Sequence, residues 1–192
     1  MQSLWLLENK KEEYKSLREN KEVEVCIIGG GLTGITCGYL LSKQGYPVCI
    51  LEKDTILSKT SGNTTAKITS QHGLFYEYLI DTFGKETAQK YYEANENAIQ
   101  EIEKIIKQEK IDCDFEKQPS YVFTNEQDEV EKIKLEVKAV NSIGGDSKFV
   151  EKTELPFPHL GAIFFPNQAM FHPVKYGKAL AQKIIEQKRN DL

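Results

Sequence analysis

The chain has 192 residues, of which 40% are hydrophobic and 28% charged, with a formal net charge of −4 and a pI of about 5.5. This length allows one good-sized domain or one and a half, and the composition is typical of a globular protein. The acidic balance argues against a dedicated nucleic-acid-binding protein, and the longest apolar runs, such as VCII and AIFF, are too short to cross a membrane.

The first twenty residues predict an N-terminal arm rather than a secretory signal. The stretch MQSLWLLENKKEEYKSL has no basic region ahead of an apolar one and no small-residue cleavage site. We expect residues 3–17 to dock on the rest of the chain, with Trp5 and Leu6 as anchors. A chain with these features is expected to be cytoplasmic, with no nucleic-acid or membrane partner.

The stretch VCIIGGGLTGITCGYLLSKQGYPVCILE, residues 25–52, carries the most specific signal. An apolar strand-like run is followed by G-x-G-x-x-G at residues 29–34. In this motif the first glycine allows the tight turn, the second lets backbone approach a pyrophosphate, and the third lets the helix pack close to the strand. A helix beginning near Leu32 would direct its unpaired N–H groups at phosphates. Residues 47–51 predict a second, parallel strand.

One acidic residue completes this pattern. Glu52 stands at the carboxyl end of the second strand, 18 residues after Gly34. A carboxylate there can accept hydrogen bonds from both hydroxyls of an adenosine ribose, and it would repel the 2′-phosphate of NADP. The sequence therefore predicts a Rossmann-like β-α-β unit that grips an ADP moiety at both ends.

These residues resemble the FAD-binding signature of the D-amino-acid-oxidase-like flavoproteins, such as glycine oxidase and sarcosine oxidase. The stretches KTSGNTTAKITSQHGLFY (59–76) and GAIFFPNQAMFHPVKYGKAL (161–180) are most similar to a bacterial branch that carries a C-terminal Rieske iron–sulfur domain. The resemblance implies FAD as the cofactor and oxidoreductase chemistry on a small-molecule substrate, with amines and amino acids as the usual class. The catalytic residues and the substrate itself are not readable from the sequence.

The loop after the ribose acid is rich in hydroxyl and amide side chains around Gly62, which suit phosphate or flavin edges. Some relatives attach FAD through a histidine of this loop. Because Thr64 or Thr65 stands there, we expect FAD to be held noncovalently. The predicted cofactor-binding residues are Gly29, Gly30, Gly31, Leu32, Thr33, Gly34, Glu52, Lys53, Ser61, Gly62, Asn63, Thr64, Thr65 and Ala66, with no metal site.

The remaining elements follow from periodicity and turn signals. Helices are predicted over 73–83, 86–108 and 125–140, the second with an apolar stripe that packs in a core. Two strands are expected around Pro119, further strands over 148–172, and a last helix from Pro173.

Two groups of side chains could bind metal or react, but both have simpler interpretations. Cys26 and Cys49 lie in strand-like runs and are expected to be small buried hydrophobes, a disulfide between them being the alternative. Asp112, Asp114 and Glu116 alternate along a predicted strand and are expected to form one solvated face.

The fold class expected is α/β: a Rossmann-like FAD-binding β-α-β unit with part of an α+β substrate domain and an incomplete sheet. We expect an N-terminal arm (1–20), an FAD-binding segment (21–84), a partial substrate domain (85–170) and a helix returning to the FAD-binding domain (171–192). Segments that close the flavin site in the resembled family, and the Rieske pattern, do not occur in the sequence. The chain is therefore expected to be the N-terminal portion of a larger oxidoreductase.

Two other functions stay open on the sequence alone. The chain could be a Rossmann module that binds NAD without flavin chemistry. It could instead be a non-catalytic remnant that acts through protein contacts, with self-association through the unpaired edge of its sheet.

Overall fold

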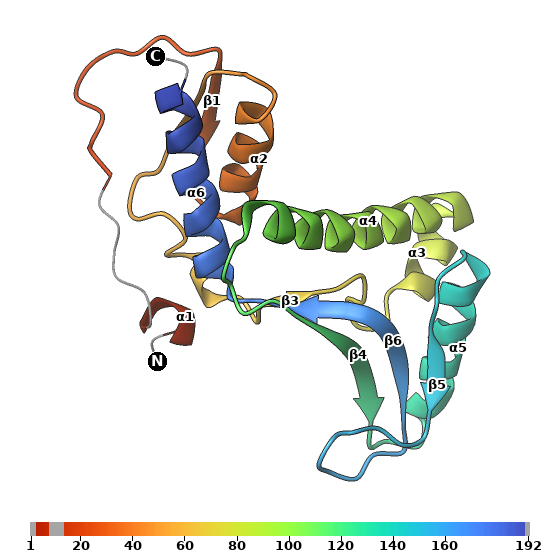
Figure 1. Ribbon diagram of the computed structural model, residues 1–192. Coiled ribbons are helices and arrows are strands. Elements are labelled where there is room, and N and C mark those ends of the chain that lie inside the picture. Colours follow the sequence, from red (N-terminus) through yellow and green to blue (C-terminus); the bar gives the residue numbers. More distant parts are fainter. Residues whose placement is uncertain (1–2, 8–13, 191–192) are drawn as a thin grey trace. The chain divides into compact units, whose positions relative to one another are not determined.

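A computed structural model describes residues 3–7 and 14–190, and the chain separates into two compact units (Figure 1). The first unit comprises residues 1–66, 109–114 and 171–192, and the second comprises 67–108 and 115–170. Helices and strands occur in both units, with a parallel β-α-β unit in the first and an antiparallel sheet with helices in the second, so the expected mixed fold is confirmed.

The first unit is built on a parallel pair of short strands. β1 (Val25–Ile28) pairs with β2 (Val48–Leu51) in the register Val25↔Val48 to Ile28↔Leu51, and α2 (Leu32–Ser42) connects them. Among the described residues, β1 pairs with β2 alone. The remaining elements of the unit are α1 (Leu4–Leu7), the 3-10 helix η1 (Thr60–Asn63) and α6 (Pro173–Asn190).

Helices α2 and α6 lie side by side, and the lack of a side chain at Gly38 allows their close approach (Figure 1). A Cβ on Gly38 would stand 2.8 Å from Ile50 Cδ1 and 3.3 Å from Ile184 Cδ1, so α2 contacts both the strand and α6 there. Ile35, Tyr39 and Leu180 are buried in this contact.

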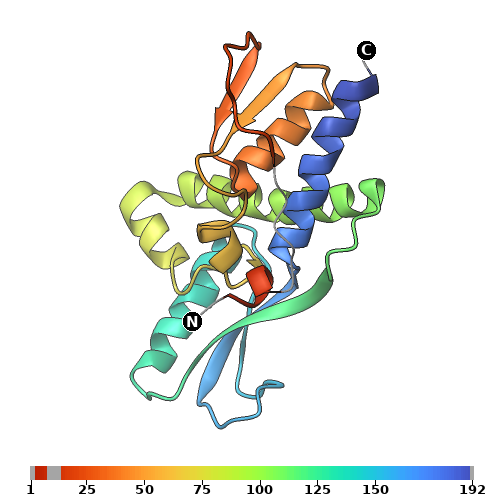
Figure 2. The same cartoon turned by 90° about the vertical axis from the view of Figure 1, so that its left-hand side faces the viewer.

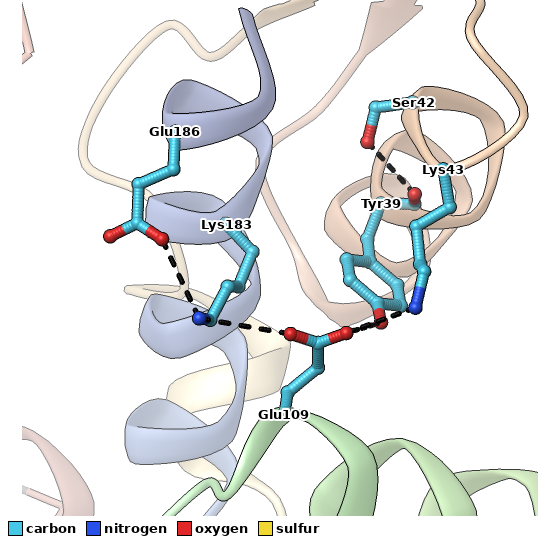
Figure 3. Close-up of polar contacts among 6 residues, drawn as sticks. All are labelled: Tyr39, Ser42, Lys43, Glu109, Lys183 and Glu186. Atoms are coloured by element: carbon cyan, nitrogen blue, oxygen red, sulfur yellow. Dashed lines mark hydrogen bonds and ion pairs between the residues drawn. The ribbon is translucent and has the colours of Figure 1, made fainter. Parts of the chain in front are cut away.

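A charged cluster joins three segments of the first unit (Figure 3). The Oη of Tyr39 donates to Glu109 at 2.6 Å, and Lys43 Nζ donates to the same carboxylate at 3.0 Å. Lys183 Nζ lies 3.7 Å from Glu109 and 3.5 Å from Glu186. The pKa of Glu109 is lowered, first by the Tyr39 hydrogen bond and then by Lys43.

The second unit is an antiparallel sheet with helices packed on it. Strand β6 (Gly161–Met170) pairs with β4 (Glu116–Thr124), β3 (Lys67–Ile68) and β5 (Lys148–Val150), and Figure 2 shows β4 beside β6. The helices are α3 (Tyr76–Phe83), α4 (Lys85–Glu109, shared at its last residue with the first unit) and α5 (Glu129–Ser142). The core of this unit contains Tyr76, Leu79, Ala88, Ile133, Val140, Ile143, Ile163 and Phe165.

A buried carboxylate caps α3 inside this unit. Glu136 of α5, whose exposed fraction is 1%, accepts hydrogen bonds from the backbone N–H groups of Phe75 and Tyr76 at 2.7 Å and of Glu77 at 2.9 Å. These three donors begin α3 and would otherwise lack partners. The carboxylate therefore joins α5 to the start of α3.

Several sequence expectations about this unit are wrong in detail. The two strands expected around Pro119 are one strand, β4, whose register shifts between Gln118 and Ser120. Proline has no N–H to donate to a ladder, so the pairing slips there while the strand continues. The first helix begins at Tyr76 rather than at 73, because Gly73 has φ +78°. The third begins at Glu129 rather than at 125, since a turn closed by Thr124 Oγ1 and the Glu126 N–H at 3.0 Å precedes it.

The expected acidic strand face is also wrong. Of its three residues only Glu116 lies in a strand. Asp114 has φ +52° and its carboxylate pairs with Lys175 Nζ at 2.7 Å. The neighbouring Cys113 is buried, and its carbonyl accepts the His172 N–H at 2.6 Å. These contacts hold residues 112–114 in a turn of the first unit instead of a strand.

Candidate nucleotide-binding site

The glycine turn between β1 and α2 has a geometry that only glycine permits at two positions. Gly29 has φ +108°, a conformation that side chains disfavour, and its N–H donates to Leu51 O at 2.8 Å. A Cβ on Gly34 would stand 2.1 Å from the carbonyl oxygen of Gly29. The turn therefore folds tightly enough for the start of α2 to rest directly on the end of β1.

An open pocket of about 410 Å³ lies over this turn and the first turns of α2. A Cβ on Gly31 would contact only Ser61 Oγ, at 3.1 Å, so the surface there is bare backbone. The first turn of any helix has N–H groups without intrahelical partners, and these favour anions. The pocket is lined by Ile27, Ile28, Gly29, Gly31, Leu32, Thr33, Gly34, Cys37, Leu41 and Ser61.

Glu52 is bonded to the glycine turn itself. One of its carboxylate oxygens accepts the Gly30 N–H at 2.8 Å and the other accepts the Asp54 N–H at 2.9 Å. The hydrogen bonds from Asp54 and then Gly30 hold the pKa of Glu52 below its ordinary value, so the group is ionised at neutral pH. A carboxylate has about four acceptor sites, more than these backbone donors occupy, so acceptor capacity remains for ribose hydroxyls.

The hydroxyl-rich loop meets the glycine turn through one side chain. Ser61, in η1, accepts the backbone N–H of Leu32 at 3.0 Å with its Oγ. Leu32 is the first residue of α2, and its N-cap residue Gly31 has no side chain to cap the helix. A residue 29 positions later therefore supplies the missing cap and lines the pocket at the same time.

The rest of the loop is fixed by packing within the first unit. The indole Nε1 of Trp5 donates to Thr64 O at 2.8 Å, and a Cβ on Gly62 would stand 2.7 Å from Leu6 Cδ2. Leu57 is buried at φ +59°, and its N–H donates to Gly30 O at 2.9 Å. The structure thus brings the two residues expected as anchors of the N-terminal arm onto this loop.

The structure brings some of the predicted cofactor-binding residues together and leaves others apart. Gly29, Gly31, Leu32, Thr33, Gly34 and Ser61 line one pocket, and Gly30 and Glu52 are hydrogen-bonded beside it. The other six predicted residues do not line this pocket. Gly62 and Ala66 are buried, Thr64 is half-buried, and Lys53, Asn63 and Thr65 are exposed.

Sequence reasoning missed four pocket residues and one property of the cysteines. Ile27 and Ile28, at the end of β1, line the pocket without having been predicted as site residues. Cys37 and Leu41 also line it, and their spacing from Thr33 (i, i+4, i+8) indicates a shared helix face that could have identified them. Cys26, expected to be buried, is exposed, and Cys49 is half-buried. The strand is open on that face because no described residue covers it.

The residues present fit the ADP half of a dinucleotide such as FAD. The glycine turn offers bare backbone and a helix N-terminus to a pyrophosphate, and Glu52 offers an ionised acceptor to a ribose. In the described part of the chain no group of three or more metal-ligating side chains occurs, and no helix is long and apolar enough to span a membrane.

Comparison with known proteins relates the chain to a protein family. A family model described as FAD dependent oxidoreductase matches residues 24–188. YhfW of Bacillus subtilis (strain 168), whose name describes a Rieske 2Fe-2S iron-sulfur protein, is 37% identical over 185 residues, which cover 96% of this chain and 36% of YhfW. This match confirms the resemblance to the Rieske-bearing branch.

Two solved structures share the fold at low sequence identity. L-Amino acid deaminase from Proteus myxofaciens superimposes with a TM-score of 0.69 at 18% identity, over 94% of this chain and 40% of that protein. Glycine oxidase from Bacillus cereus gives 0.63 at 22% identity, over 86% and 44%. The chain therefore spans less than half the length of these relatives.

The family match covers most of the chain, including the glycine turn, Glu52 and the Ser61 loop. It supports FAD as the cofactor, in agreement with the fit of those residues to an ADP moiety. The chain belongs to the FAD-dependent oxidoreductase family.

Proposed function

We propose that this chain forms the FAD-binding part of an oxidoreductase that acts on amines or amino acids. The observation that carries the proposal is the Glu52 carboxylate, bonded to the Gly30 N–H at 2.8 Å at the end of β2. This contact sets the ribose acceptor against the phosphate-binding turn, as a bound ADP moiety requires. The names of the glycine oxidase and amino acid deaminase relatives support the substrate class.

Each part of the proposed site has a role that follows from its chemistry. The backbone of Gly29–Gly31 and the first turn of α2 bind the pyrophosphate, and the Glu52 carboxylate accepts hydrogen bonds from the ribose hydroxyls. Ser61 holds its loop against the turn through Leu32. Bound FAD supplies the capacity to accept two electrons and hydrogen from a substrate, while the protein orients both. The other proposed contacts are Lys53, Gly62, Asn63, Thr64, Thr65 and Ala66.

We propose that FAD is held without a covalent bond and that the two units have different functions, nucleotide binding and substrate binding. The loop carries Thr64 and Thr65 where some relatives attach the flavin through histidine, and threonine cannot form that link. Acid precipitation should release all flavin into the supernatant. The first unit would bind the nucleotide, and the second would form part of a substrate domain. The sequence-based boundaries 1–20, 21–84, 85–170 and 171–192 stay a prediction; the compact units divide the chain at residue 66 rather than 84 and place residues 109–114 in the first unit.

A fluorescence titration of the purified chain with FAD and, separately, with NAD tests the proposal. We expect saturable binding of FAD, weaker binding of NAD, and loss of both in Gly31→Val, whose branched side chain would project into the bare pocket surface. Normal FAD binding by a variant that keeps its circular dichroism spectrum would show that the phosphate site is elsewhere.

Turnover is expected to need more than these 192 residues. The chain covers 36% of YhfW and 40–44% of the two structural relatives, so more than half of the length of these proteins has no counterpart in these 192 residues. We expect no oxygen consumption dependent on amines or amino acids above that of free flavin. Measured turnover would mean that the described residues already contain a complete catalytic site.

The open edge of β1 supports a further proposal about partners. The side chain of Ile28 is 81% exposed, and β1 pairs only with β2 in the described part of the chain. An apolar strand edge of this kind favours pairing with a second copy. Light scattering should show self-association that rises with concentration and decreases in Ile28→Lys. A wild type that stays monomeric at every concentration would contradict the proposal.

A further inference from the structure

Two free cysteines stand opposite each other on the paired strands of the first unit. The register of β1 and β2 places Cys26 directly beside Cys49. Side chains alternate along a strand, and partners in register point to the same face of a sheet. Both thiols therefore lie on one face of this two-stranded sheet.

That face is the one turned away from α2. Close approaches to Gly34 and Gly38 show that Ile27 and Ile50 point toward the helix, so their neighbours Cys26 and Cys49 point the other way. Cys26 is exposed and Cys49 is half-buried. A reagent can reach the first thiol directly, and the second lies beside it on the neighbouring strand.

The spacing of the strands suits a covalent link. Neighbouring strands lie about 4.8 Å apart, and disulfides join residues whose Cα atoms are about 4.4–6.8 Å apart. Among the described residues β1 has a strand partner on one edge only, so a small movement of β1 toward β2 on closure of the disulfide would disrupt no second ladder there. Cys113, by contrast, is buried, and Cys37 lies on α2, which packs on the opposite face.

We propose that Cys26 and Cys49 form an oxidation-sensitive thiol pair that closes to a disulfide when it meets a hydroperoxide. The exposed Cys26 attacks the peroxide oxygen, which breaks the O–O bond and leaves a sulfenic acid, and one water is released. Cys49 then attacks that sulfur, forms the S–S bond and expels the hydroxyl as a second water. The two thiols together lose two hydrogen atoms, that is two protons and two electrons, and hydrogen peroxide takes these up and is reduced to two waters.

This pair is independent of the proposed flavin function, but it lies three residues before both Gly29 and Glu52. The disulfide would join the two strands from which the glycine turn and the ribose acid emerge. The thiol state of the chain would thereby act directly on the strands that carry the nucleotide site.

Peroxide treatment of the reduced full chain tests the proposal by intact mass and thiol titration. We expect the mass to fall by two hydrogen atoms and two of the four thiols to disappear, with both changes reversed by a reductant. Cys37→Ser should behave like the wild type. Cys26→Ser and Cys49→Ser should each abolish the loss of two hydrogens.

Peptide mapping of the wild type gives the assignment without any variant. Trypsin leaves Cys26 and Cys37 in one peptide, residues 22–43, so chymotrypsin cleavage after Leu32 is needed to separate them. A link between the peptides containing Cys26 and Cys49 is the expected product. A link through Cys37 or Cys113, a covalent dimer, oxygen addition without hydrogen loss, or four unreacted thiols would each overturn the proposal.

Discussion

The Oγ of Ser61 lies 3.0 Å from the backbone nitrogen of Leu32 and accepts its N–H. The bond joins a loop that follows the second strand to the first residue of the helix that follows the first strand. Both partners line the pocket over the glycine turn. The loop and the turn thus form one surface, and each depends on the other for its position.

Removing this hydroxyl should affect both stability and binding. Ser61→Ala leaves the Leu32 N–H without its cap, so we expect the free energy of unfolding to fall by about 1 kcal/mol, the usual cost of a lost N-cap. FAD affinity should fall by roughly three- to tenfold. Thr60→Ala, which removes the exposed hydroxyl one position earlier, is the matched control for urea unfolding and flavin titration. Equal effects of the two changes would show that the Ser61 cap does not matter.

Neutralising Glu52, the proposed ribose acceptor, should weaken FAD binding more strongly than Ser61→Ala does. Glu52→Gln replaces an ionised acceptor by a neutral amide. One of the two backbone N–H groups that donate to Glu52 in the wild type would then face an NH₂ group instead of an acceptor oxygen. The expected loss is about 1–3 kcal/mol of binding free energy. Asp54→Asn removes a charge two residues away on an exposed side chain, paired with Lys59 at 3.1 Å, and should leave FAD affinity nearly unchanged. Unaltered affinity in Glu52→Gln would exclude the assigned role.

The cap on α3 should be a large contribution to the stability of the second unit. Glu136→Ala leaves three backbone donors of residues 75–77 without their acceptor, and we expect a loss of about 2–4 kcal/mol in the free energy of unfolding. Glu131→Ala on the same helix removes an exposed partner of Lys134 and should change stability by less than about 0.5 kcal/mol. A loss below 1 kcal/mol (roughly one neutral hydrogen bond) in Glu136→Ala would contradict the capping role.

The Glu109 cluster should make stability depend on pH. The pKa of Glu109 is lowered in the folded chain, by Tyr39 and then Lys43, relative to its ordinary value of 4.5. Its contribution is therefore present above pH 4.5 and is lost as the pH falls through the lower folded value. We expect Glu109→Gln to lower the free energy of unfolding by about 1–2 kcal/mol at neutral pH. At a pH below the folded-state pKa of Glu109, the substitution should change it little.

Thermal unfolding from neutral to acidic pH measures this difference. Glu101→Gln, which removes an exposed partner of Lys104 from α4, is the control and should follow the wild type at every pH. If the gap between wild type and Glu109→Gln stays constant across the pH range, the charge of Glu109 is not what stabilises the cluster.

The parts of the fold that were predictable from sequence are those set by local chemistry. The strand, glycine turn and helix around residues 25–42 follow from the special backbone needs of Gly29 and Gly34, and Pro173 marks the start of the last helix. The strand through Pro119 was not predictable in this way. Its continuity depends on pairing with β6, more than 40 residues later in the chain, which overrides a local break.

The site shows the same division. The glycine turn and Glu52 were predictable from their spacing in the sequence. The Ser61 cap on Leu32 and the Trp5 hydrogen bond to Thr64 were not, because they join residues that are 29 and 59 positions apart. Leu57 has φ +59°, a conformation that its residue type does not predict. The exposure of Cys26 likewise depends on which elements cover the sheet, not on the apolar run in which the cysteine lies.

The central claim is that the glycine turn, Glu52 and Ser61 together hold the ADP half of FAD. Amide chemical shifts of the ¹⁵N-labelled chain, followed by NMR during a titration with FAD, test it most directly. We predict saturable shifts concentrated at residues 29–34, at Glu52 and Asp54, and at Ser61, with little change in the strands of the second unit. Shifts that do not saturate, or that are centred on residues 116–170, would contradict the account.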